Sequence, residues 1–165
     1  MTTNETAMTE IQILEETLNH YHGHPERFGR GDDQLCRYRV SDQAMCAIGR
    51  CVDWDTLPES DASAIAKYNG GSGDFLDYFG ERVLRAKYAG HTTTFWAILQ
   101  SLHDTTFYWD IQGNISPLGL RFVIENFPDF DCKDWVADDG NARLAYSHAL
   151  ALMEADRAFQ KSVTT

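Results

Sequence analysis

The sequence predicts an α+β fold, a mainly helical single domain with one small antiparallel β-hairpin. Three observations favour this class. Several segments repeat apolar residues at helical spacing, one short segment alternates apolar and polar residues around a turn, and 165 residues with 43% hydrophobic composition suffice for one buried core. We expect a globular domain over 9–161, a disordered N-terminus at 1–8 and a frayed C-terminus at 162–165.

The first predicted helix follows a capping-box pattern. Thr9 precedes Gln12 by three residues and opens EIQILEETLNHYH, in which the apolar residues follow helical spacing. The following GHPERFGRGDD is rich in glycine and breaks regular structure, so it predicts a loop.

The hairpin is predicted at 35–48, LCRYRVSDQAMCAI, because apolar and polar residues alternate on both sides of the turn-forming SDQ. A three-residue loop would pair Tyr38 with Cys46 and place Arg37 and Arg39 on one face. The apolar residues on the other face would be Cys36, Tyr38, Val40, Ala44, Cys46 and Ile48. A two-residue loop would instead place Cys46 beside the two arginines.

Later helices are predicted from caps and apolar spacing. They are ASAIAKY, capped by Ser60 or Asp61; one or two short helices within GSGDFLDYFGERVLRAKYAG; TTFWAILQSLHD, with a threonine cap; PLGLRFVIENF, with Ser116 as cap and Pro117 in the first position; and ARLAYSHALALMEADRAFQKS, capped by Asn141.

The charge and the cysteines limit the class of protein. A net charge of -11 argues against direct binding to bare nucleic acid, which requires clustered Lys and Arg. The chain contains no apolar run of the roughly 18 residues that a spanning helix needs, so we expect a cytoplasmic protein without membrane association. In that compartment the four cysteines are expected to be free thiols. The sequence leaves open whether the protein forms a homo-oligomer.

A short motif spans the predicted hairpin and a later helix. It reads Cys36-x-Tyr38-Arg39, a turn, Cys46-Ala47-Ile48-Gly49, and then a helix that ends in His103-Asp104. This pattern resembles a group of small uncharacterised proteins of bacteriophages and some bacteria. The resemblance covers about 35–104 and implies a phage-type protein in the host cytoplasm. The segment RCVDWDTLPES after Gly49 differs from the apolar residues and Pro-Asp-Glu-like turn of that group.

Two reactive sites are weighed against simple packing. A zinc site built from Cys36, Cys46 and Cys51 with His103 or Cys132 lacks the closely spaced ligand pair of most structural zinc sites, so no metal and no cofactor is predicted. A nucleophile at Cys46 or Cys36, activated by His103 and oriented by Asp104, is disfavoured, since neighbouring helical residues point apart and both cysteines are placed on an apolar face. The favoured interpretation of His103 and Asp104 is a helix end, and no catalytic residue is assigned.

Binding is predicted at two places. Arg37 and Arg39 could form a fork for a phosphate or carboxylate, or could pair with the protein's own acids. The ligand-binding candidates are Arg37, Tyr38, Arg39, Cys46, His103 and Asp104. The acidic window from Glu125 to Asp139 could meet a basic protein surface or imitate DNA, or could be a solvated loop. The interface candidates are Asp129, Asp131, Asp134, Trp135, Asp138 and Asp139.

The function predicted from these features is that of a small acidic phage-type accessory protein. It would bind a host protein with a basic surface, or a small anionic ligand, and would counteract host defence. The defence role follows from the genomes that the resemblance implies. The predicted role is therefore non-enzymatic. The alternative is a pocket-type binder or enzyme that acts on a nucleotide-like anion through the hairpin at Arg39.

Overall fold

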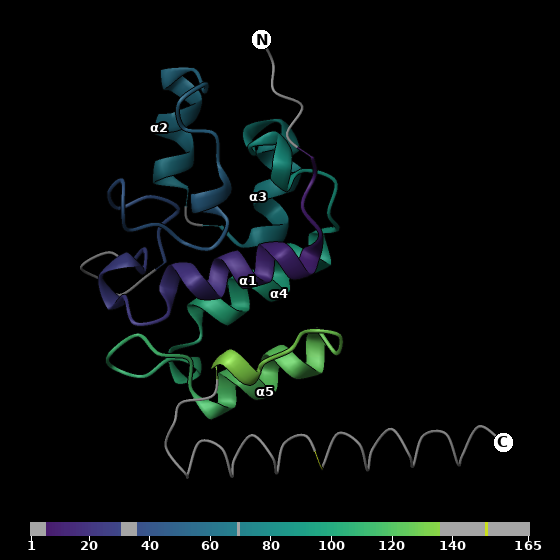
Figure 1. Cartoon of the computed structure of the whole chain (residues 1–165). Helices are drawn as coiled ribbons and strands as arrows, with labels where there is room; N and C mark the ends of the chain where they lie inside the picture. Colours follow the sequence, from purple (N-terminus) through teal and green to yellow (C-terminus); the bar gives the residue numbers. More distant parts are fainter. Residues whose placement is uncertain (1–5, 31–35, 69, 136–150, 152–165) are drawn as a thin grey trace, which may run out of the picture.

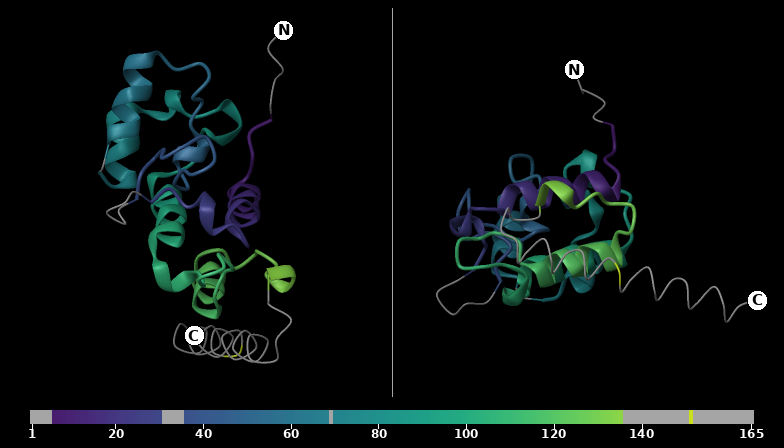
Figure 2. Two further views of the ribbon diagram at one scale, coloured as in Figure 1. Left: turned by 90° about the vertical axis from the view of Figure 1, so that its left-hand side faces the viewer. Right: turned by 60° about the horizontal axis from the view of Figure 1, so that its bottom comes forward.

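The structure is a computed structural model that describes residues 6–30, 36–68, 70–135 and 151. Within these residues the chain forms five α-helices joined by loops and short 3-10 helices. The α-helices are α1 (Glu10–Tyr21), α2 (Glu59–Lys67), α3 (Ser72–Phe79), α4 (Thr93–Asp104) and α5 (Pro117–Asn126). In Figure 1, α2 and α3 lie above α1 and α4, and α5 lies below them. The left view of Figure 2, turned about the vertical axis, shows the same order.

The predicted starts of three helices are confirmed. The Thr9 hydroxyl accepts the backbone N–H of Gln12, whose side chain accepts the N–H of Thr9, completing the capping box of α1. The Thr92 hydroxyl caps α4 by accepting the backbone N–H of Phe95. Ser116 caps α5, and Pro117 takes its first position, where the missing N–H costs no hydrogen bond.

The start of α2 lies slightly earlier than predicted. The helix begins at Glu59, with Pro58 in the cap position, rather than after Ser60 or Asp61. The predicted helix after Asn141 lies outside the described residues, as do most residues of the expected disordered and frayed ends. No helix in the described ranges is both long and apolar enough to cross a membrane.

The core combines buried residues of α1, α3, α4 and α5 with those of the loop at 46–52. Leu14 and Leu18 of α1 and Trp96 and Leu99 of α4 are fully buried, and Phe75 of α3 packs in the same cluster. The apolar positions of α1 and α4 recur at helical spacing, so each helix presents one continuous face to the others. This core holds the C-terminal half of α4 against the loops that follow α1.

The predicted β-hairpin is wrong, and with it the α+β class, because no β-strand occurs in the described part of the chain. The segment 36–48 is an irregular loop with one tight turn, in which the N–H of Val40 donates to the carbonyl of Ala44 at 2.8 Å. Its bridges are isolated contacts rather than a ladder. Val40, expected on the buried face, is 50% exposed. The structure is a mainly helical fold.

Contacts of Gly29 explain why the segment 36–48 does not form a hairpin. It bonds to both expected strands: its carbonyl accepts the N–H of Arg37 at 2.6 Å, and its N–H donates to the carbonyl of Met45 at 3.2 Å. A Cβ atom on Gly29 would lie 2.5 Å from the backbone of Arg37 and of Cys46, so only glycine fits there. The segment therefore bonds to a distant loop as well as to itself.

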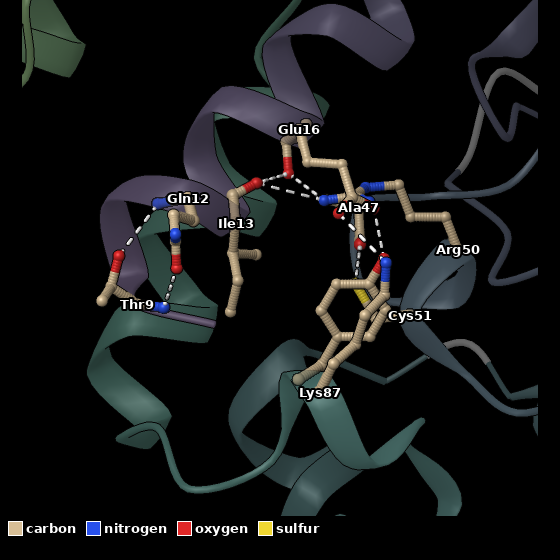
Figure 3. A network of polar contacts seen from close by, with 10 residues as sticks. Thr9, Gln12, Ile13, Glu16, Ala47, Arg50, Cys51 and Lys87 are labelled. Atoms are coloured by element: carbon tan, nitrogen blue, oxygen red, sulfur yellow. Dashed lines mark hydrogen bonds and ion pairs between the residues drawn. The ribbon is translucent and has the colours of Figure 1, made fainter. Parts of the chain in front are cut away.

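A buried polar network joins α1 to the loops above it (Figure 3). The Arg50 guanidinium, 7% exposed, lies 2.8 Å from a carboxylate oxygen of Glu16 and donates to the carbonyl of Ile13 at 3.2 Å. Lys87 contacts the other Glu16 oxygen at 3.3 Å, and the Tyr88 hydroxyl also donates to Glu16. Burial opposes ionisation of Glu16, but these donors and cations outweigh it and lower the pKa of its carboxyl.

Candidate functional site

A cavity of about 460 Å³ opens between the loop that carries Cys36, the start of α3 and the end of α4. Cys36 and Tyr38 form the first wall and 70–72 form the second. The third wall consists of Ala97, Gln100, Ser101, Asp104 and Thr105. Its size is in the range of pockets that hold small molecules.

His103 and Asp104 form a bonded pair at the end of α4. The Nδ1 atom of His103 lies 2.8 Å from Oδ1 of Asp104. The imidazole is fully buried, stacked on Phe28 with ring centroids 5.2 Å apart and tilted against Tyr21 at 4.8 Å. The aromatic rings fix the position of the imidazole, while Asp104 borders the cavity.

Cys36 lies beside this pair and is connected to it by Gln100. The Gln100 side-chain nitrogen donates to the Cys36 sulfur at 3.1 Å and to Oδ1 of Asp104 at 2.8 Å. The backbone N–H of Ile48 donates to the Gln100 side-chain oxygen at 3.4 Å, which orients the amide. The Cys36 sulfur, a ring nitrogen of His103 and a carboxylate oxygen of Asp104 all lie within 4.8 Å of one another.

The electrostatics of the three groups are coupled. Burial alone would lower the pKa of His103, but the Asp104 carboxylate and Cys36 raise it above its ordinary value. The same contacts lower the pKa of Asp104 against the effect of burial. The contact with Cys46 and burial raise the pKa of Cys36, while His103 acts in the opposite direction. The resting cluster is therefore a protonated thiol beside an imidazole whose charged form is stabilised.

At Cys36 the structure answers the objection that Asp104 cannot orient His103, and it places the thiol at a cavity rather than in the core. Asp104 does contact its own neighbour, because its side chain turns back along α4 to meet the His103 ring. Cys36 is half-buried and borders the cavity, whereas Cys46 is fully buried, with its sulfur accepting the N–H of Gly49 at 3.3 Å. All four cysteines are free thiols, as predicted from the sequence. Only Cys36 among them lines this cavity.

Sequence reasoning missed two residues of the site, Gln100 and Ser72. Gln100 is a polar residue on the otherwise apolar face of α4 and is itself buried, so its position one turn before Asp104 was an available signal. Ser72 stands between two glycines at the start of a short helix, and no local pattern distinguishes it from an ordinary loop residue.

The two arginine candidates do not line this cavity. Arg39 pairs with Asp42 and lies over the Trp54 ring, 4.7 Å from the ring centroid. Arg37 is half-buried, and its backbone is bonded to Gly29 and Cys46. Of the ligand-binding candidates, the structure brings together Tyr38, His103 and Asp104 with Cys36, and it leaves the arginines elsewhere.

The acidic interface candidates are only partly described. Asp129 and Asp131 are exposed, and Asp131 pairs with Lys133 at 3.0 Å. The Trp135 ring packs edge-on against His22, with centroids 5.3 Å apart. The side chain of Asp134, and Asp138 and Asp139, lie outside the described part of the chain.

Cys36, His103 and Asp104 also supply the sulfur, nitrogen and oxygen ligands that zinc accepts. The orientation of Gln100 argues against a cation among them. Its N–H groups point at the sulfur and the carboxylate, and Ile48 holds its oxygen away. Such donors stabilise negative charge on sulfur or oxygen, so the arrangement suits thiol chemistry better than metal binding.

Comparisons with protein-family models, with curated proteins and with solved structures found no match for this chain. The resemblance to phage proteins therefore stays a prediction. The chemistry of the cavity is the remaining guide to function.

Proposed function

We propose that this chain is a cysteine-dependent enzyme in which Cys36 attacks a small acyl compound bound in the cavity. The observation that supports this proposal is the convergence of a thiol, an imidazole and a carboxylate within 4.8 Å of one another. The thiol and the carboxylate line the cavity, and the imidazole is buried behind them. A nucleophile, a base and a group that orients the base are the recurring parts of covalent acyl transfer. Gln100 adds a donor to the attacking sulfur.

The roles follow from the contacts. Because the resting thiol is protonated, attack requires a base, and the His103–Asp104 pair accepts the thiol proton as the sulfur–carbon bond forms. The electrons of the carbonyl double bond move to its oxygen and return as the leaving group departs with a proton. Asp104 stabilises the imidazolium formed in this step, in agreement with the raised pKa of His103. The Gln100 N–H stabilises the developing thiolate before the bond is complete.

Reaction with p-nitrophenyl acetate tests the proposal. We expect one equivalent of p-nitrophenol per chain and an acetyl group that peptide mass mapping places on Cys36. Cys36→Ala removes the acetyl group, because the nucleophile is lost. Cys132→Ala is the matched control, because that cysteine is buried away from the cavity, and it keeps the acetylation at Cys36. Acetylation that persists in Cys36→Ala, or that never occurs at Cys36, would overturn the proposal.

The role of an accessory protein that binds a host protein stays a prediction. Asp129 and Asp131 are exposed, as an interface requires, and so are many surface acids. The alternative prediction assigns a nucleotide-like anion to Arg39. This residue pairs with Asp42 and does not line the cavity at Cys36.

A further inference from the structure

A second cavity lies beside the buried Arg50 network. It has a volume of about 250 Å³ and is lined by side chains of α1, of the loop at 42–54 and of the segment 85–88. Its lining residues all differ from those of the cavity at Cys36. The two cavities are therefore separate candidate sites.

The cations that line this cavity outnumber its acids. Arg50, Arg85 and Lys87 line it, together with Glu16 and Asp42. Glu16 contacts both Arg50 and Lys87, so its one negative charge is shared between two cations (Figure 3). One positive charge at this end of the cavity is therefore left without a counter-charge.

The other acid, Asp42, is already neutralised. It pairs with Arg39, which lies over the Trp54 ring at the cavity wall. Arg85 is exposed, and its side chain forms no hydrogen bond or ion pair with the residues that the structure describes. With Arg39 included, four cations face two acids, in a chain whose net charge is -11. A local excess of positive charge attracts anions.

Two buried polar atoms of the lining are an independent sign of a ligand. Nε of Arg50, whose side chain is 7% exposed, and Nε2 of His20 have no hydrogen-bond partner among the described residues. Buried polar atoms nearly always have a partner. The Arg50 Nε–H is a donor in every state, and the Nε2 atom of a neutral imidazole is a donor in one tautomer. Both atoms therefore suit an anionic oxygen.

His20 adds no charge of its own to this balance. Burial and the positive charges of Arg50 and Arg27 lower the pKa of His20 to about 4, so its imidazole is neutral at physiological pH. The excess around the cavity is therefore two positive charges, from the four cations and two acids counted above.

We infer that this second cavity binds a phosphate group, either free or as part of a phosphate monoester. Such a group carries up to about two negative charges at neutral pH, which matches the local excess better than a single carboxylate does. Arg85 and Lys87 donate to its oxygens, and the buried Arg50 contributes positive charge from behind them. The site does not depend on the proposed role of Cys36.

An NMR titration of the isotope-labelled full chain tests the site at neutral pH. The reporter is the indole N–H signal of Trp54, because this residue lines the cavity. The titrants are sodium phosphate, adenosine monophosphate and adenosine, in about 0.15 M NaCl, which screens weak attraction between exposed charges. We expect both phosphate compounds to shift the signal with a dissociation constant of about 1 mM or lower, and adenosine to leave it unchanged.

The relative affinities distinguish the two sources of the phosphate group. Tighter binding of adenosine monophosphate than of free phosphate identifies a phosphate monoester as the ligand. Equal affinities, or tighter binding of free phosphate, identify inorganic phosphate.

Arg85→Gln is the decisive variant. Because Arg85 is exposed and unpaired in the described part of the chain, its loss leaves the fold intact. We expect phosphate to bind about tenfold more weakly, since one charge-assisted hydrogen bond is lost. Arg82→Gln is the matched control, because it removes the same charge three residues earlier from a side chain that is 69% exposed and does not line the cavity. It keeps the affinity.

Three results would overturn the phosphate site. They are a Trp54 signal that does not respond to either phosphate compound at about 10 mM, an equal response to adenosine, and equal weakening by Arg85→Gln and Arg82→Gln. Each of these results leaves the proposed function intact, because Cys36 lines the other cavity.

Discussion

Replacing Gly49 with alanine is expected to destabilise the fold by more than about 4 kcal/mol. Gly49 is buried against the backbone of Tyr38, where a Cβ atom would lie 2.7 Å from the Tyr38 carbonyl carbon and closer still to its oxygen. Backbone cannot rotate away as a flexible side chain can, so the loop must move. Since small domains have only about 5–15 kcal/mol of stability, much of the variant is expected to be unfolded.

Gly73→Ala is the matched control, measured by denaturant unfolding alongside Gly49→Ala. Gly73 lies inside α3, and a Cβ atom there would meet no atom within 4 Å. Alanine at this position is expected to raise the free energy of unfolding by about 0.5–1 kcal/mol, because it reduces the entropy of the unfolded chain. Equal effects of the two substitutions would contradict the close approach of Gly49 to Tyr38.

Arg50→Ala is expected to lower the free energy of unfolding by about 3 kcal/mol. The guanidinium bonds to Glu16, to the carbonyl of Ile13 and to the hydroxyl of Thr17, and it also lies over the Tyr88 ring (Figure 3). Its removal leaves the carbonyl of Ile13 and the hydroxyl of Thr17, both on α1, without this donor. Glu16 keeps Lys87 and Tyr88, which limits the loss.

Arg82→Ala is the control for Arg50. Arg82 pairs with Asp61 at 3.2 Å, but its side chain is 69% exposed, so the loss is expected to be at most about 0.5 kcal/mol. Chemical denaturation of both variants checks the difference. A loss at Arg50 as small as that at Arg82 would show that the buried network contributes little to stability.

The helices could be predicted because their signals are local. The side chains of Thr9, Thr92 and Ser116 cap backbone groups only three residues away, so a short sequence window contains both partners. The apolar spacing of α1 and α4 likewise lies within one window.

The predicted hairpin failed for the opposite reason. Alternation at 35–48 indicated which side chains are apolar, and Tyr38, Cys46 and Ile48 are indeed buried. It could not indicate that Gly29, from a preceding loop, would bond to both expected strands. A backbone contact between distant segments has no signature in local alternation.

The site could be predicted only in part. The sequence pointed to Tyr38, His103 and Asp104, but spacing alone did not reveal that the Asp104 side chain turns back to His103. The positions of Cys36 and Gln100 in the cavity depend on how the 36–48 loop folds over α4. The contact of Asp104 with His103 and the place of Cys36 and Gln100 depend on side-chain direction and tertiary packing. Residue spacing does not specify either of these.

The rate constant for reaction of iodoacetamide with Cys36 at pH 7, in Asp104→Asn and in the unchanged protein, tests the central claim most directly. Asparagine removes the charge that raises the pKa of His103 and so makes it a stronger base, and His103 is the group that lowers the pKa of Cys36. Loss of that charge is expected to slow the reaction about tenfold, because the thiolate fraction falls tenfold for each pKa unit. Asp129→Asn, an exposed acid outside the cavity, serves as the control and keeps the rate. An Asp104→Asn protein that folds and reacts at the unchanged rate would contradict the coupling of Cys36, His103 and Asp104.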